Sequence, residues 1–149
     1  MSTWLTDDEQ RAWRGLVHMT SRLDARLNRA LQQTSGLSLG DYDVLVLLTE
    51  APGGRLRMFE LSENLQWEQS RLSHHLARMQ RRGLVEREEC TTDRRGAFVV
   101  LAAAGRDALD KAAPAHVALV RQLVFDELSE AEVAVLESFT GRVLARLVE

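Results

Sequence analysis

The residues of this chain best suited to binding chemistry are arginines gathered in one short stretch. Residues 70–87 hold five arginines and a single carboxylate, Glu86. A guanidinium group donates several hydrogen bonds in one plane, a geometry that matches phosphate oxygens and the O6 and N7 atoms of guanine. The whole chain has a net charge of −3, which by itself argues against a polyanionic partner. Local charge decides such binding, however, so the basic stretch predicts a nucleic-acid surface.

The spacing of residues 69–82 predicts a helix with two different faces. Three apolar residues fall on one side of a helical wheel and are expected to face a core: Leu72, Leu76 and Met79. The opposite side carries small or polar and basic residues: Ser70, Arg71, Ser73, His74, Ala77, Arg78 and Arg81. We expect Arg71 to contact a guanine, and the two serines and His74 to contact bases or phosphates. Arg78 and Arg81 are candidate phosphate contacts. A solvated basic face on an ordinary surface helix is the alternative, and the elements that follow decide between the two.

A second group of arginines lies on the loop Asp93-Arg94-Arg95-Gly96, between two predicted strands at 84–88 and 97–101. Two neighbouring arginines repel each other unless an anion meets them. The position of the loop at the tip of a hairpin predicts a wing, whose arginine would enter the narrow, negative minor groove beside the basic helix. A solvated turn in which Asp93 neutralises one arginine is the alternative.

The other reactive side chains form no catalytic or metal-binding pattern. His74 and His75 are adjacent and point about 100° apart on a helix, so they cannot share one metal, and His18 and His116 are isolated in sequence. The chain has no HExxH motif, no CxxC motif and no glycine-rich phosphate loop. The sequence therefore predicts neither an enzyme nor a bound metal or cofactor. Cys90, at the end of the first predicted strand, is expected to be structural rather than a peroxide sensor.

Capping signals and apolar periodicity place helices before the basic one. Thr6 followed by Glu9 has the spacing of a capping box, and helical periodicity continues from there to about Gln33. Such a helix would be roughly 40 Å long, more than one small module covers, so a second copy of the chain is the expected partner. A shorter helix can begin after Ser38, and another over 58–65 precedes the basic helix across a three-residue turn.

Helical periodicity returns after the hairpin, near residue 103. Pro114 is expected to kink or restart this helix, and Ser129 with Glu132 has the spacing that caps a last one. Two short helices with a tight turn, followed at once by a hairpin, form a winged helix-turn-helix. The predicted fold class is therefore mainly α with a small β-hairpin wing. The DNA-binding module is expected over 38–102, with dimerisation helices at 5–34 and 103–149.

Composition excludes several other classes of protein. The 149 residues are 45% hydrophobic and 28% charged, which suits a folded domain with helical extensions rather than a disordered chain. No apolar run approaches the roughly 20 residues that cross a bilayer, and the N-terminus lacks the pattern of a signal peptide. A single cysteine suits a reducing compartment. The expected location is the cytoplasm.

These motifs together resemble the multiple-antibiotic-resistance regulator (MarR) family, from about residue 39 to residue 101 and more loosely over the whole chain. The matching stretches are Leu61-Ser62-Glu63-Asn64-Leu65, Ser70-Arg71-Leu72-Ser73-His74-His75-Leu76, Arg82-Gly83-Leu84-Val85, Asp93-Arg94-Arg95-Gly96 and Val99-Val100-Leu101. The resemblance implies a homodimer with one winged module for each half-site of a pseudo-palindromic double-stranded DNA operator. It also implies that Arg95 enters the minor groove, that Arg94 contacts a phosphate and that Asp93 orients the wing. The chain departs from the family pattern at Gln66, where relatives often have glycine, and at Glu68, where they often have a capping residue.

The resemblance further implies a small-molecule pocket between each winged module and the dimer helices. Four residues are candidates for lining it: Trp13, His18, Met58 and Trp67. Such side chains suit a small aromatic effector, although each suits a core equally well. The sequence thus predicts a sequence-specific DNA-binding transcriptional regulator, a repressor released by its effector. The alternative is a winged-helix dimer that acts as a protein-interaction module without DNA binding, whose outer helix face would be neutral or apolar.

Overall fold

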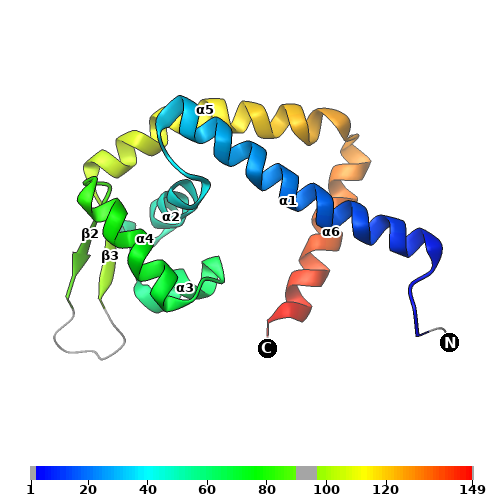
Figure 1. Ribbon diagram of the computed structural model, residues 1–149, viewed down its shortest axis with the longest axis horizontal. Helices are drawn as coiled ribbons and strands as arrows, with labels where there is room; N and C mark the ends of the chain where they lie inside the picture. The colour runs from blue at the N-terminus through cyan, green and yellow to red at the C-terminus, as the bar shows by residue number, and fades with distance from the viewer. Residues whose placement is uncertain (1–2, 90–96, 149) are drawn as a thin grey trace. The chain divides into compact units, whose positions relative to one another are not determined.

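The computed structural model describes residues 3–89 and 97–148 and confirms the predicted fold class, a mainly helical chain with a small antiparallel sheet (Figure 1). The described helices are α1 (Asp7–Ser35), α2 (Leu39–Glu50), α3 (Met58–Leu65), α4 (Gln69–Arg81), α5 (Ala103–Leu123) and α6 (Glu130–Leu147). The described strands are β1 (Arg55–Arg57), β2 (Val85–Glu88) and β3 (Phe98–Leu101). The chain forms two compact units, residues 1–113 and 114–149.

Helix boundaries follow the capping signals in the sequence. The Thr6 hydroxyl accepts a hydrogen bond from the Glu9 backbone N–H at 3.1 Å, and the Glu9 carboxylate accepts one from the Thr6 N–H at 2.8 Å. Ser129 and Glu132 form the same reciprocal pair at the start of α6. These bonds satisfy backbone donors that the first turn of a helix leaves unpaired. Both predicted capping boxes are therefore confirmed.

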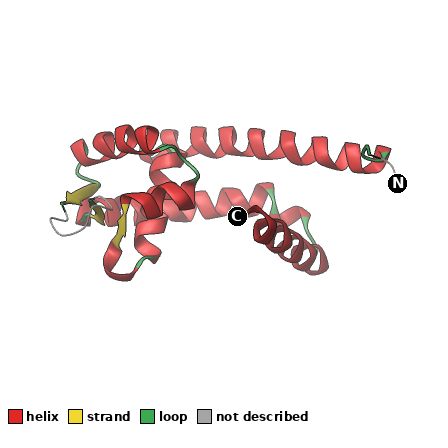
Figure 2. Ribbon diagram, turned by 90° about the horizontal axis from the view of Figure 1, so that it is seen from below, coloured by secondary structure: helices red, strands yellow, loops and turns green. Residues whose placement is uncertain are grey.

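The three described strands pair in the order β1-β3-β2, and both pairings are antiparallel. Leu56, Val99 and Arg87 share one register position, and Arg57, Phe98 and Glu88 share the next. The strands are the short yellow segments in Figure 2. The two predicted strands are confirmed, each beginning one residue later than expected. The sequence did not predict β1, because three residues between Gly54 and Met58 are too few to show a period-2 pattern.

The core of the first unit lies where α2, α3, α4 and the sheet meet. Its fully buried members come from all of these elements: Val44, Leu45, Leu48, Leu61, Leu72, Leu76, Met79, Val85 and Val99. The start of α5 also packs closely here, since a Cβ added to Gly105 would lie 2.1 Å from the backbone oxygen of Leu84. Burial of each large aliphatic side chain contributes about 1.5–3 kcal/mol, so the helix-turn-helix is held from behind by a continuous apolar layer.

The second unit is made of helices whose apolar residues remain accessible. α5 continues through Pro114 as one helix, so a restart at that position is wrong, and the alternative of a kink there stays a prediction. α6 has no buried residue in the described chain, and its exposed apolar side chains are Val135, Phe139, Val143, Leu144 and Leu147. Among the residues that the structure describes, no helix is long and apolar enough to cross a membrane.

Candidate nucleic-acid interface

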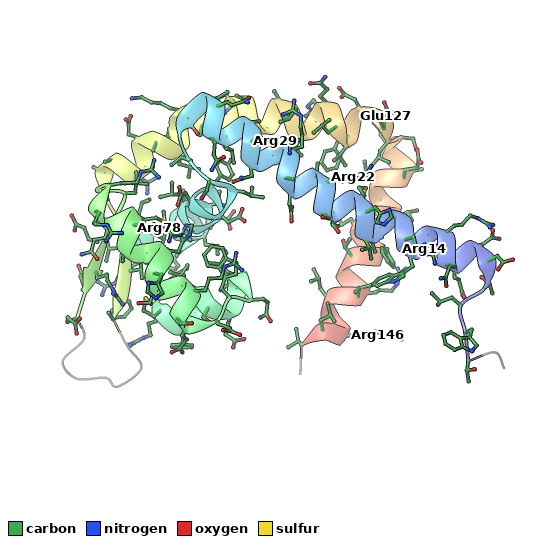
Figure 3. The ribbon with its side chains drawn as sticks, in the orientation of Figure 1. Arg14, Arg22, Arg29, Arg78, Glu127 and Arg146 are labelled. Atoms are coloured by element: carbon green, nitrogen blue, oxygen red, sulfur yellow. The ribbon has the colours of Figure 1, made fainter. Side chains whose placement is uncertain are left out.

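α4 presents the two faces that its sequence predicts. Leu72, Leu76 and Met79 have no exposed surface. On the opposite side Ser73 is half-buried, and the other predicted polar contacts are exposed: Ser70, Arg71, His74, Arg78 and Arg81. Arg78 is labelled among the side chains that project from this helix in Figure 3. The first turn holds no acidic residue, and Arg78 and Arg81 stand in the last turn. The exposed face of α4 is therefore basic and is fixed to a rigid core.

The turn between α3 and α4 has a strained but well-bonded backbone. Gln66 adopts φ 56°, in the left-handed region that favours glycine. Its side-chain amide donates to the Glu63 backbone oxygen at 2.6 Å, and the Ser62 hydroxyl donates to the Trp67 backbone oxygen at 2.6 Å. Glu68 makes no side-chain capping bond to α4. Both departures from the family pattern thus have structural consequences: strain at Gln66 and an uncapped start of α4.

Trp67 follows this turn and contacts the recognition face directly. The Arg71 guanidinium carbon lies 4.3 Å from the centre of the indole ring. The Trp67 and His75 rings meet edge to face, with centroids 5.0 Å apart. A Cβ added to Gly40 would lie 2.9 Å from the Trp67 ring and 2.9 Å from the His75 ring, so the start of α2 approaches both rings as closely as glycine permits.

Asp41, buried at the start of α2, links α2 to α4. His75 Nε2 lies 2.8 Å from one carboxylate oxygen, and Arg82 Nη1 donates to the other at 3.0 Å. Arg82 Nη2 also donates to the Gly36 backbone oxygen at 3.0 Å. Burial raises the pKa of Asp41, but the contacts with His75 and Ser38 lower it more, to about 2. The Asp41 carboxylate therefore stays charged at neutral pH and binds both His75 and Arg82. These two contacts form an anchor between the start of α2 and α4.

The outer face of the sheet adds cations that sequence analysis did not single out. The guanidinium carbons of Arg55 and Arg57 lie 4.0 and 4.4 Å from the centre of the Phe98 ring. Arg55 also pairs with Glu88 at 3.0 Å, which offsets part of the charge. The alternation Arg-Leu-Arg at 55–57 is the sequence signal for these cations. It lies in β1, the strand that the sequence did not predict. The predicted wing residues Asp93, Arg94 and Arg95, like Cys90, lie outside the described residues.

A pocket of about 530 Å³ opens between α1, α2 and the start of α4. Its lining residues are Asp24, Ala25, Asn28, Ser38, Leu39, Gly40, Asp43, Trp67, Arg71, His75 and Arg78. Of the four predicted effector-contacting residues, Trp67 lies in this lining. Trp13 and His18 are exposed on α1, and Met58, half-buried at the start of α3, receives an N–H of Arg87 on its sulfur at 3.8 Å. The structure therefore does not bring the four together.

Comparisons with known proteins agree with this geometry. A model of the MarR family matches residues 35–96. AbsC, a MarR family transcriptional regulator from Streptomyces coelicolor, is 40% identical with a TM-score of 0.90, over 98% of this chain and 98% of that one. Sco3205, a MarR family transcriptional regulator from the same organism solved in complex with DNA, is 39% identical with a TM-score of 0.93, over 100% of this chain and 93% of that one.

A mutant MarR from E. coli complexed with operator DNA is 27% identical with a TM-score of 0.75, over 87% of this chain and 91% of that one. A comparison with curated proteins finds no match. The first two similarities run through nearly the full length of this chain, well beyond the helix-turn-helix. By its sequence and by its fold, this chain belongs to the MarR family of transcriptional regulators.

Proposed function

We propose that this protein is a sequence-specific, double-stranded DNA-binding transcriptional regulator that acts as a homodimer. The exposed basic face of α4 carries the proposal, because its cations project from a helix whose other face is fully buried. Two relatives support it, since Sco3205 was solved in complex with DNA and a MarR mutant was complexed with operator DNA. A neutral or apolar outer face, which a protein-docking module would need, does not match these residues.

In this proposal α4 lies in the major groove of the operator. The small side chains of Ser70 and Ser73 let the helix approach the bases, while Arg71 reaches a guanine and His74 a base or phosphate. Arg78 and Arg81 contact phosphates. The wing residues Asp93, Arg94 and Arg95 serve the neighbouring minor groove, with Arg95 entering it. The winged module is taken as residues 38–102.

The dimer would form through the helices at 5–34 and 103–149. Three large apolar side chains of α1 are exposed, Trp13, Val17 and Met19, as are those of α6. An apolar groove in the second unit is lined by Leu128, Ala131, Glu132, Val135, Leu136 and Phe139. Monomeric proteins rarely leave such surfaces in water. A dimer would bury them and present two α4 helices to half-sites about one helical turn apart.

The pocket beside α4 is the proposed effector site, and a small aromatic molecule is the proposed effector. Trp67 contributes an apolar wall there, and Arg71 and Arg78 offer hydrogen-bond donors. Because these two arginines are also proposed DNA contacts, an occupied pocket would weaken operator binding and release a repressor. The proposed role is that of a binding protein rather than an enzyme, acting in the cytoplasm.

Substitution of single arginines tests the proposed contacts. Arg71→Ala should relax specificity at one base-pair position, with a cost of about 1–3 kcal/mol in operator binding. Arg95→Ala should weaken binding to all sequences. Fluorescence anisotropy with duplexes from the DNA flanking the coding region measures both. Arg106→Ala removes an exposed arginine of α5 and is the matched control, expected to bind as the unaltered protein does. If Arg71→Ala and Arg95→Ala match this control at equal salt, both assignments are wrong.

A further inference from the structure

We propose that Trp67 is a positioning residue for base recognition, because its indole ring holds the Arg71 guanidinium in the orientation that reads a base pair. This inference rests on the proposed DNA-binding function. The Arg71 guanidinium carbon lies 4.3 Å from the ring centre, within the range of a cation–π contact. Trp67 itself stands outside α4 and acts through Arg71.

The stack leaves the donors of Arg71 available. A guanidinium group is planar and its N–H bonds lie in that plane. The face of an indole ring carries no oxygen or nitrogen acceptor in the plane of these donors, so the contact with Trp67 pairs none of them with a hydrogen-bond acceptor, and it restricts rotation of the long side chain. Among the described residues, Arg71 forms no ion pair with a carboxylate, and its side chain is exposed. Stacking thus orders an arginine that would otherwise lose more conformational freedom on binding a base.

Trp67 is itself fixed in place before any ligand arrives. Its ring is partly buried against the hydrophobic core and meets the His75 ring edge to face. Gly40 leaves no room on the α2 side, where a Cβ would lie 2.9 Å from the indole. The Trp67 backbone oxygen accepts from the Ser62 hydroxyl, and its N–H donates to the Ser62 backbone oxygen at 3.3 Å. An indole ring fixed by the core, by His75 and by Gly40 can preorganise the Arg71 side chain that contacts it.

A structural role and a positioning role predict different losses. If Trp67 only supports the fold, its removal weakens binding to every duplex alike. If it orients Arg71, its removal lowers the discrimination ratio. This ratio is the affinity for the operator divided by the affinity for a duplex changed at the base pair that Arg71 reads. We expect Trp67→Leu to lower this discrimination ratio about threefold to tenfold. Trp67→Phe keeps an aromatic face and should retain most of it.

A double-mutant cycle tests the inference. The probe is an operator selected from a pool of random duplexes with the unaltered protein, together with its single base-pair variants. Discrimination ratios are measured for the unaltered protein, Trp67→Leu, Arg71→Ala and the double variant, and thermal melts check that each is folded. We expect Trp67→Leu to have no further effect on discrimination once Arg71 is removed. A matched cycle combines Trp67→Leu with Arg81→Ala, on the same helix. Here Trp67→Leu should lower the discrimination ratio by the same factor whether or not Arg81 is present.

The outcomes separate this inference from the proposed function. If Arg71→Ala lowers discrimination and Trp67→Leu does not, the positioning role is wrong and DNA binding stands. A Trp67→Leu effect that persists in the Arg71→Ala background also overturns it. If Arg71→Ala leaves discrimination unchanged, both the base contact and the positioning role are wrong. Failure of the unaltered protein to bind any duplex overturns the proposed function and this inference together.

Discussion

α4 and α6 both carry several apolar side chains, but they differ in what covers these side chains. In α4 the apolar residues are fully buried within the first unit, and the exposed side is basic. In α6 no residue is buried in the described chain, and Val135 and Leu144 are 66% and 62% exposed. The difference shows that a single chain buries the apolar residues of α4 but leaves those of α6 exposed. α4 is ready to meet a polar ligand, whereas α6 requires an apolar partner.

The largest expected effect is loss of stability from the buried side of α4. Leu76→Ala removes a side chain with no exposed surface, and the cavity should lower the free energy of unfolding by about 3 kcal/mol. Urea denaturation followed by circular dichroism measures it. Leu144→Ala removes the same group from the exposed side of α6 and is the control. If both variants lose equal stability when compared at low protein concentration, the two helices do not differ as described.

The next effect concerns the partner of α6. Val135→Glu places a charge in the apolar groove and should raise the dissociation constant of the proposed dimer by about 100-fold, because an unpaired charge would be buried. Analytical ultracentrifugation over a concentration series measures it. Ser138→Glu adds the same charge beside Arg142, whose side chain donates to Ser138, and should leave the dimer intact. A Val135→Glu protein that dimerises as strongly as this control would place the interface elsewhere.

The third effect concerns the anchor that joins α4 to α2. The pKa of Asp41 is lowered from 3.8 to about 2, so its contribution to folding is present above pH 3.8 and is lost as the pH falls towards 2. The contribution is roughly 2 kcal/mol. Asp41→Asn should therefore remove part of the decrease in unfolding free energy between pH 5 and pH 2, measured by urea denaturation at each pH.

Asp43→Asn provides a control of opposite sign for the same measurement. Burial and the charge of Asp24 raise the pKa of Asp43, so its ionised form opposes folding and protonation relieves this as the pH falls. Removing the charge should not destabilise the protein at pH 6. An acid dependence that is unchanged in Asp41→Asn would show that the carboxylate does not anchor α4.

The sequence predicted those features that depend on neighbouring residues. The two faces of α4 follow from helical spacing of Leu72, Leu76 and Met79, and the starts of α1 and α6 follow from capping spacings. Resemblance to a family supplied the expectation of a wing and of an operator. The predictions of the two helix faces and of the capped starts succeeded because periodicity and capping are local properties of the chain. The wing contacts and the operator stay predictions.

Features that depend on distant residues were not predicted. Asp41 meets His75 and Arg82 across more than thirty positions, and no local pattern marks such a cluster. Trp67 was placed in an effector pocket on its residue type alone. The structure places it against Arg71, only four residues further along the chain. Helical spacing does not describe this contact, because Trp67 precedes the first residue of α4 and its position depends on the turn at Gln66. Element types were thus readable in the sequence, whereas side-chain partners required the fold.

The measurement that tests the central claim most directly is the salt dependence of duplex binding by the unaltered protein. About eight phosphate contacts per dimer should give a slope near −7 for the logarithm of the association constant against the logarithm of salt concentration. Raising salt from 50 to 200 mM would then weaken binding by about four orders of magnitude. A flat dependence, or no binding at 50 mM salt, would show that the basic face of α4 does not meet DNA.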